Sequence, residues 1–415
     1  MVNMKDSEIE WLGEIPESWG LSRIGSVYEL RNTKVSDRDY PPLSVTNKGI
    51  VPQLETAAKT NAHDDRKLVK KGDFAINSRS DRRGSCGISS YEGSVSLINT
   101  ILAPLGEMNP RYYDWLFHTV QFGDEFYKWG HGIVDDLWTT NWQDMKKITI
   151  PMPGLDEQKK IAVFLDAKCS EIDALSADIQ AEIDTLEEYK RSIITEKVTK
   201  GLYSDVEMKD SGIEWVGAIP SSWDVHPVYY YFGERKTINY DLKEQNLLSL
   251  SYGKVIRKDI NTNGGLLPAN FSTYNIVEAG DIIVRPTDLQ NDKRSLRTGL
   301  VIEHGIITSA YITLMPKSDV NSKYFHYLLH AYDIMKVFYN MGNGVRQGLN
   351  YNGFSKLMIV SPPKEEQQQI IDYLDKMCLE IDAIIAIKKE QLVVLDEYKK
   401  AVIYEYVTGK EEVSM

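Results

Sequence analysis

MKDSEIEWLGEIPESW at residues 4–19 recurs as MKDSGIEWVGAIPSSW at residues 208–223. Twelve of the sixteen positions are identical, at an offset of 204 residues. Self-similarity of this strength at a fixed offset is the mark of an internal repeat. The chain is therefore expected to contain two copies of one structural unit.

A longer repeated segment follows each copy, after a central region. It begins PGLDEQKKIAVFLD and ends LEEYKRSIITEKVT over residues 153–199, and it begins PPKEEQQQIIDYLD and ends LDEYKKAVIYEYVT over residues 362–408. The central regions, residues 20–150 and 224–360, are alike only in faint echoes. Near-identical flanks around divergent centres indicate two copies of one docking surface and two different ligands.

Both long segments have the apolar spacing of coiled-coil helices. In the first, apolar residues recur at every seventh position: Leu165, Ile172, Ile179, Leu186 and Ile193. In the second, the same series is broken once by Lys388: Leu374, Ile381, Leu395 and Val402. Such a seam requires a partner helix. The other long segment of the same chain, running antiparallel, is the expected partner, and a homodimeric coiled coil is the alternative. Gly201 and Gly409 follow the last turns as stop signals.

The net charge of −12 counts at first against a nucleic-acid partner, because phosphate contacts need Lys and Arg. The charge is unevenly distributed. Residues 20–150 hold 17 Lys and Arg against 16 Asp and Glu, and residues 224–360 hold 15 against 12. The remaining charge of −16 lies on the long segments and the Trp-bearing repeats. The central regions are mildly basic and remain candidates for DNA contact.

Basic residues gather in one loop of each central region, and each loop is predicted to follow a strand. Arg and Lys suit the edge of guanine, and Asn and Gln suit the edge of adenine. From the first loop we predict DNA contacts by Asn77, Arg79, Arg82 and Arg83. From the second loop we predict DNA contacts by Arg285, Lys293, Arg294 and Arg297. A solvated surface loop is the alternative, and the occurrence of both clusters favours DNA.

A second pair of segments extends this predicted DNA surface. PLSVTNKGIVPQ at residues 42–53 echoes LLSLSYGKVIRK at residues 247–258. From these segments we add the following residues to the predicted DNA-contacting set: Asn47, Lys48, Tyr252, Lys254 and Arg257.

The duplicated flanks are acidic and rich in Trp, and a duplicated surface suits two copies of one partner. We predict that four residues of these flanks bind that partner: Trp11, Trp19, Trp215 and Trp223.

No motif predicts a catalytic residue or a metal site. His326 and His330 have the spacing of a zinc pair, but the Glu of an HExxH motif is missing, and a satisfied pair on a helix face is favoured. Asn109 begins an Asn-Pro-Arg-Tyr sequence that lacks the second Pro of the amino-methyltransferase loop and is expected to cap a helix. No GxxxxGK[ST] phosphate loop is present.

The sequence is expected to belong to a cytoplasmic protein. It has no run of ~18 apolar residues that would span a membrane. Its N-terminus lacks the apolar core of a secretory signal. Its three cysteines, Cys86, Cys169 and Cys378, are too few and too scattered for a disulfide framework.

The end of the second central region carries a family resemblance. It reads GNGVRQGLN at residues 342–350, LMIV at 357–360 and PP at 362–363. This stretch resembles the one that closes each target recognition domain in the specificity subunits of type I restriction-modification enzymes. The IEWxGxIPxSW segments are similar to the openings of those domains. The resemblance adds Arg346 and Gln347 to the predicted DNA-contacting set, whereas the first copy has Asp135 and Asp136 there.

The resemblance implies an α/β fold. Two globular target recognition domains would be separated by two long antiparallel helices, related by an internal pseudo-two-fold duplication. The expected boundaries are a first recognition domain at 1–152, a first spacer helix at 153–203, a second recognition domain at 204–361, and a second helix with its tail at 362–415.

The resemblance also implies a function. The chain would be a non-catalytic subunit that reads a bipartite, asymmetric DNA sequence, docks two methyltransferase subunits and joins restriction (motor) subunits. It would hold no cofactor itself, since S-adenosylmethionine, ATP and Mg would belong to its partners. A coiled-coil scaffold with duplicated protein-binding domains and a fused methyltransferase are the alternatives.

Overall fold

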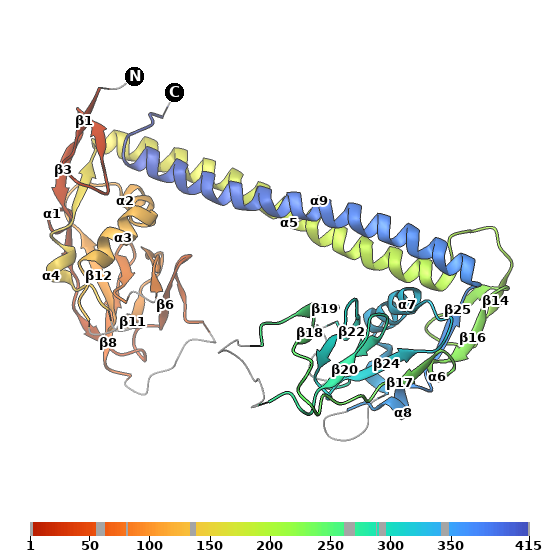
Figure 1. Cartoon of the computed structure of the whole chain (residues 1–415). Coiled ribbons are helices and arrows are strands. Elements are labelled where there is room, and N and C mark those ends of the chain that lie inside the picture. Colours follow the sequence, from red (N-terminus) through yellow and green to blue (C-terminus); the bar gives the residue numbers. More distant parts are fainter. Residues whose placement is uncertain are drawn as a thin grey trace. The chain divides into compact units, whose positions relative to one another are not determined.

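The computed structural model describes residues 3–54, 63–79, 82–132, 138–260, 270–287, 289, 296–341 and 348–413. The chain forms two compact units. Unit 1 contains residues 1–180 and 389–415, and unit 2 contains residues 181–388. Each unit therefore joins one predicted recognition domain to parts of both long helices, α5 (Leu155–Lys200) and α9 (Lys364–Val407) (Figure 1).

Unit 1 is built on small antiparallel sheets. The largest has the order β10-β9-β12-β4. Its strands are β4 (Tyr28–Leu30), β9 (Phe74–Asn77), β10 (Cys86–Ile88) and β12 (Asn99–Pro104). A second sheet has the order β11-β8-β5, with β5 (Lys34–Val35), β8 (Arg66–Val69) and β11 (Gly93–Ser96). The described residues of the unit also form three strand pairs: β1 (Met4–Asp6) with β2 (Glu14–Pro16), β3 (Gly20–Arg23) with β13 (Thr149–Met152), and β6 (Leu43–Thr46) with β7 (Gly49–Pro52).

Unit 2 repeats this architecture. Its largest sheet has the order β17-β24-β21-β22, with β17 (Phe232–Glu234), β21 (Ile282–Val284), β22 (Thr298–Leu300) and β24 (Ile312–Pro316). The remaining strands pair as β14 (Met208–Asp210) with β15 (Ala218–Pro220), β16 (Asp224–Pro227) with β25 (Met358–Ser361), β18 (Leu248–Ser251) with β19 (Lys254–Arg257), and β20 (Asn275–Val277) with β23 (Gly305–Ile307). The α/β duplication predicted from the sequence is confirmed.

Short helices cover the sheets in both units. Those of unit 1 are α1 (Ile24–Val27), α2 (Pro110–Phe117), α3 (Val120–Lys128) and α4 (Trp142–Met145). Those of unit 2 are α6 (Val228–Tyr231), α7 (Ser322–Ile334), the 3-10 helix η3 (Val337–Asn340) and α8 (Tyr351–Phe354). Asn109 caps α2 as predicted, because its side chain accepts hydrogen bonds from the backbone N–H groups of Arg111 and Tyr112.

The two long helices pair antiparallel along the predicted seam. In unit 2, Lys190 of α5 forms an ion pair of 2.7 Å with Asp382 of α9, and Glu182 pairs with Lys388. The partner's number falls as the number along α5 rises, which is the antiparallel order. Unit 1 shows the same order, with Asp173 against Lys399 at 2.6 Å. The single charged seam residue, Lys388, is therefore satisfied by an acid of the facing helix.

The ends of the long helices explain the repeated flanks. Gly201 and Gly409 follow α5 and α9 with φ values of +81° and +72°. A Cβ at Gly409 would lie 2.9 Å from Trp19, and one at Gly201 would lie 3.3 Å from Trp223. Only glycine accepts this backbone conformation at so close an approach. Each Trp-bearing flank thus packs on the end of the long helix that terminates in its own unit.

This packing corrects the predicted partner-binding role of three tryptophans. Trp11, Trp19 and Trp223 are buried inside their own units. Trp11 contacts Phe122 edge to face, with ring centroids 6.0 Å apart. A large aromatic ring gains most by burial in a core, and these three rings cannot present a docking surface. Trp215 alone among the four remains accessible, with 41 % of its surface exposed.

None of the described helices is both long and apolar enough to cross a membrane.

Candidate nucleic-acid interface

Two equivalent hairpins present predicted DNA-contacting residues to solvent. In β6–β7 the register pairs Thr46 with Gly49, which leaves Asn47 and Lys48 as an exposed two-residue tip. In β18–β19 it pairs Ser251 with Lys254, so that Tyr252 and Gly253 form the tip.

The unit 2 tip has the backbone of a tight hairpin turn. Tyr252 and Gly253 both have positive φ, at 46° and 79°, as a primed two-residue turn requires. The Tyr252 side chain is 89 % exposed, and Lys254 beside it is also exposed. An exposed aromatic ring beside a lysine can contact a sugar, a base edge or a phosphate.

The loop after β9 divides into buried and exposed residues. Asn77 is buried, and its side-chain oxygen accepts a hydrogen bond from the backbone N–H of Arg79 at 3.1 Å. This bond holds the loop, so the prediction that Asn77 reads a base is wrong for this conformation. Arg79 is half-buried and its backbone bridges to Thr139.

Arg82 and Arg83 of the same loop are exposed. The Arg83 guanidinium forms an ion pair of 2.7 Å with Asp124 and lies over the Tyr127 ring, 5.1 Å from its centroid. This pair is exposed on both sides and is easily exchanged for a phosphate or a base edge. The exposed half of the loop is compatible with DNA contact.

The corresponding arginine of unit 2 has a different place. Arg297 is fully buried, and its guanidinium donates hydrogen bonds to the backbone oxygens of Thr287 at 2.5 Å and Arg285 at 3.4 Å. It also lies over the Tyr339 ring, 5.2 Å from the centroid. A guanidinium committed to carbonyl oxygens in the core cannot reach a base. The prediction of DNA contact by Arg297 is therefore wrong, and Arg297 instead holds residues 285–287, which directly follow β21.

The other predicted contacts of unit 2 are placed as follows. Arg285 is half-buried. Arg257 is exposed and forms an ion pair with Glu303, which raises the pKa of the guanidinium. Four predicted residues lie outside the described residues: Lys293, Arg294, Arg346 and Gln347.

A buried ion pair supports the basic loop in each unit, and the sequence interpretation missed both. Arg31 holds Asp73 with bonds of 2.6 and 3.1 Å, and Arg235 holds Asp281 at the same two distances. Burial raises the pKa of Asp281, and the Arg235 guanidinium opposes this rise. Each acid immediately precedes the strand that leads into the basic loop. The echo between KGDFAINSR (71–79) and AGDIIVRPT (279–287) carried the signal, since both contain this acid.

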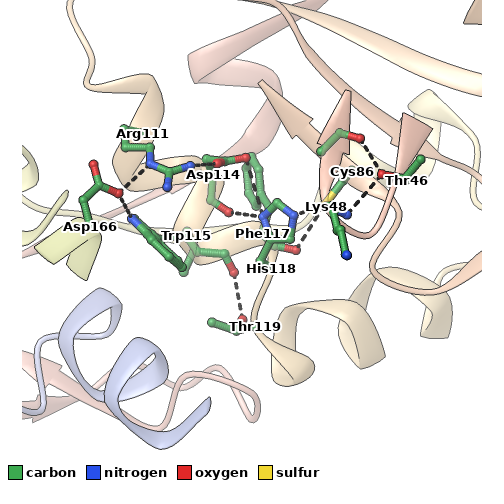
Figure 2. A network of polar contacts seen from close by, with 12 residues as sticks. Thr46, Lys48, Cys86, Arg111, Asp114, Trp115, Phe117, His118, Thr119 and Asp166 are labelled. Atoms are coloured by element: carbon green, nitrogen blue, oxygen red, sulfur yellow. Dashed lines mark hydrogen bonds and ion pairs between the residues drawn. The ribbon is translucent and has the colours of Figure 1, made fainter. Parts of the chain in front are cut away.

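One cluster in unit 1 has the residue types of a nucleophilic triad. Cys86 Sγ lies 3.6 Å from His118 Nε2, and His118 Nδ1 lies 3.5 Å from Asp114 Oδ1 (Figure 2). Burial raises the pKa of the Cys86 thiol well above its usual range, so the reactive thiolate is disfavoured. The cluster is a polar contact between β10 and α2. Among the described residues, no group of three or more His, Cys, Asp or Glu side chains could hold a metal.

A family model described as the type I restriction modification DNA specificity domain matches residues 16–185 and again residues 248–394. The chain belongs to this family. Each matched stretch contains one exposed hairpin, β6–β7 or β18–β19, so the surface described above occurs once in each copy of the specificity domain.

Curated relatives carry the same description. The chain is 25 % identical to the putative type I restriction enzyme MjaX specificity subunit of Methanocaldococcus jannaschii, over 98 % of this chain and 96 % of that protein. It is 23 % identical to the type I restriction enzyme MjaVIII specificity subunit of the same organism, over 95 % and 93 %. Both relatives are named as the specificity subunits of their enzymes, and the chain is a specificity subunit of this kind, not a catalytic one.

Solved structures share the fold. A chain from a structure of a type I R-M system covers 96 % of this chain with a TM-score of 0.72 at 12 % identity, and 99 % of that chain is covered. The HsdS subunit from Thermoanaerobacter tengcongensis matches with a TM-score of 0.50 at 15 % identity, over 96 % of this chain and 98 % of the other. At these identities the likeness concerns the fold.

Proposed function

We propose that this specificity subunit binds a bipartite, asymmetric DNA sequence, with one half-site read by each unit. The observation that carries the proposal is the pair of equivalent hairpins with different tips. Asn47 and Lys48 stand in one copy where Tyr252 and Gly253 stand in the other. Side chains at base edges determine which bases are bound, so two different tips on one fold suit two different half-sites.

The long helices would act as the spacer between the half-sites. The helix α5 has 46 residues, which at ~1.5 Å per residue correspond to about 69 Å. A paired helix of this length is stiff compared with a loop. The number of base pairs between the half-sites would then be set by the helices, and the half-site sequences by the hairpins and loops.

We further propose that two methyltransferase subunits bind, one to each copy of the repeated flanks and helix ends. The buried tryptophans leave the long helices as the better candidate surface. In unit 2, α9 exposes three large apolar side chains, Leu379, Ile384 and Ile387. The helices and flanks also carry most of the negative charge. Exposed apolar side chains among acids suit a partner helix with a basic rim.

Cofactors are assigned to the partners in this proposal. S-adenosylmethionine would be bound by the methyltransferase subunits, and ATP with Mg by the restriction (motor) subunits. The specificity subunit would act on cellular DNA in the cytoplasm. Equilibrium dialysis of the isolated chain against S-adenosylmethionine checks this assignment, since binding by this chain alone would favour a fused methyltransferase instead.

A chimera tests the assignment of one half-site to each unit. The variant carries the central region 20–150 in place of residues 224–360, between unchanged flanks. Assembled with its methyltransferase partner, it is expected to methylate an inverted repeat of one half-site, whereas the natural chain methylates an asymmetric sequence. Mapping of methylated adenines on a random DNA library gives the readout. An unchanged target would contradict the proposal, and an absence of duplex binding by the natural chain, with or without partners, would favour the scaffold.

A further inference from the structure

The helix α2 of unit 1 is held to the long helix α5 by one carboxylate. Asp166 of α5 accepts hydrogen bonds from Arg111 Nε at 2.7 Å and from Trp115 Nε1 at 2.9 Å (Figure 2). Arg111 and Trp115 lie one turn apart on the same face of α2. Both bonds end on the same oxygen, Oδ1. Two donors from one helix face converge on a single point of the long helix.

Unit 2 forms the equivalent contact with different donors. Asp375 of α9 forms an ion pair with Lys323 and accepts a hydrogen bond from the Tyr327 hydroxyl at 2.9 Å. Lys323 and Tyr327 follow Arg111 and Trp115 at an offset of 212, and Asp375 follows Asp166 at an offset of 209. A cation and an aromatic donor, one turn apart, therefore meet one long-helix carboxylate in both units. The shared feature is the geometry and not the donor residue type.

A second contact reaches the other long helix. The Tyr112 hydroxyl of α2 donates to the backbone oxygen of Val407, in the last turn of α9, at 2.7 Å. The Tyr324 hydroxyl of α7 donates to the backbone oxygen of Val198, near the end of α5, at 3.1 Å. Each recognition domain is thus bonded to the helix that begins in its unit and to the helix that ends there. These hydrogen bonds add directional contacts to an apolar core that the domain of unit 1 already shares with both long helices, including Leu165 of α5 and Val407 of α9.

The carboxylate contact of unit 1 is half-exposed, which limits its contribution to the stability of the fold. The side chains of Arg111 and Asp166 are 47 and 46 % exposed. Ion pairs at such sites contribute little to the free energy of unfolding. The buried core and the tyrosine hydrogen bonds therefore stabilise the fold, and the half-exposed carboxylates can act on the orientation of α2 and α7 without adding much to stability.

We propose that Asp166 and Asp375 are positioning residues that determine how selective the assembled enzyme is for one number of base pairs between its half-sites. The proposal rests on the spacer role proposed above. A reading hairpin at a fixed angle to the long helices meets the duplex at one separation and one rotational phase. A hairpin whose domain can rock accepts neighbouring separations as well, because each base pair changes the rotational phase by ~35°.

The test compares matched alanine variants in the assembled methyltransferase. Asp166→Ala and Asp375→Ala, alone and combined, are expected to leave both half-site sequences unchanged and to raise methylation at neighbouring gap lengths several-fold relative to the preferred gap. The controls are Asp178→Ala on α5 and Glu380→Ala on α9, two exposed acids for which no ion pair or hydrogen bond is found in the described structure. Methylation of a DNA library with randomised gap lengths gives the readout, with thermal unfolding measured alongside.

Milder variants keep the test decisive if the alanine variants do not fold. Tyr327→Phe removes one donor and keeps the ring, and Trp115→Phe removes one donor and keeps an aromatic side chain; the same broadening is expected on a smaller scale. A gap distribution identical to that of the natural chain in active variants would overturn the proposal. Loss of methylation by folded variants would overturn it too, because a residue that only sets an angle leaves the half-sites readable. A natural chain without any preferred gap would instead contradict the spacer role itself.

Discussion

The two units differ most clearly in the layer beneath their hairpins. In unit 1, Asp114 of α2 is buried and forms an ion pair with Arg111, and His118 lies one turn further along. At the same positions of α7, unit 2 has His326 and His330. No acid is paired with these imidazoles among the described residues, and the His326 Nε2 and His330 Nδ1 atoms have no hydrogen-bond partner there. The residues beneath the hairpin, here called the floor, thus include a charged acid in unit 1 and two neutral imidazoles in unit 2.

The neutral floor adjoins a cavity of about 570 Å³ in unit 2. The hairpin residues from Tyr252 to Ile256 form one wall, and His326, Tyr327 and His330 form another. In unit 1 a Cβ at Gly87 would come within 2.8 Å of the Gly49 Cα atom in the hairpin backbone, whereas a Cβ at the equivalent Gly299 of unit 2 would meet the hairpin side chains of Leu250 and Val255 at 2.5 and 3.0 Å. The comparison shows that divergence between the copies reaches below the tips into the support of the hairpin, while the long-helix anchors stay the same.

The largest expected difference between the units is in their response to acid. Burial lowers the pKa of His326 to about 3 and that of His330 to about 4, from an ordinary 6.5. The folded imidazoles stay neutral between pH 6.5 and 4, whereas unfolded ones take up protons, so stability is lost as pH falls below about 6.5. At ~1.4 kcal/mol per pH unit below 6.5 for each of the two imidazoles, acidification to pH 5 should cost up to about 4 kcal/mol.

Urea unfolding of the natural chain and of the double variant His326→Leu, His330→Leu between pH 7 and 5 measures this effect. The double variant should lose the histidine part of the pH dependence and keep that of the carboxylates. An equal slope in both proteins would show that these imidazoles are protonated in the folded state.

The second comparison concerns the two arginine loops. Arg297→Met is expected to destabilise unit 2 by about 2–3 kcal/mol, since it leaves two backbone oxygens without their donor. The variant should weaken DNA binding only through the lost stability of unit 2, and not through a lost contact between Arg297 and DNA. Unfolding and DNA binding measured on the same preparation separate the loss of stability from the loss of affinity. A loss of affinity in a fully stable variant would show that Arg297 contacts DNA after all.

Substitution of the buried acid beneath the unit 1 hairpin, Asp114, should destabilise the protein more than substitution of an acid in an exposed ion pair. Asp114→Asn removes the charge of a buried carboxylate that pairs with Arg111 and should cost about 2 kcal/mol. Asp124→Asn breaks the exposed pair with Arg83 and should cost less than about 0.5 kcal/mol. Denaturant unfolding of both variants checks the ranking, and equal losses would contradict the difference in burial as its cause.

The last prediction concerns the exposed loop of unit 1 and affects DNA binding alone. Arg82→Ala and Arg83→Ala should each weaken DNA binding by the assembled enzyme by ~1–3 kcal/mol if the lost contact is to a base, with no change in unfolding. Fluorescence anisotropy at two salt concentrations measures the affinity and separates a base contact from a phosphate contact, which reduces the salt dependence. Unchanged affinity in both variants would remove this loop from the interface.

The duplication and the two long helices could be predicted from the sequence, and so could the correspondence of the two segments that form the hairpins, although not their hairpin structure. Those features depend on local and periodic signals: the repeat at offset 204, the heptad seam, and the paired echoes at 42–53 and 247–258. Even the stop signals at Gly201 and Gly409 were local, because a positive φ after a helix favours glycine whatever surrounds it.

Which side chains are accessible to DNA or to a partner depends on tertiary packing. Trp19 is a residue type typical of docking sites, yet it is buried against the end of α9. Arg297 is a residue type typical of base contacts, yet its guanidinium is bonded to the carbonyl of Thr287 after β21. Asp166 was ordinary in the sequence, and its importance rests on donors 51 and 55 residues away. Burial and hydrogen bonding between distant segments are set by the packing of the whole unit, and no local pattern records them.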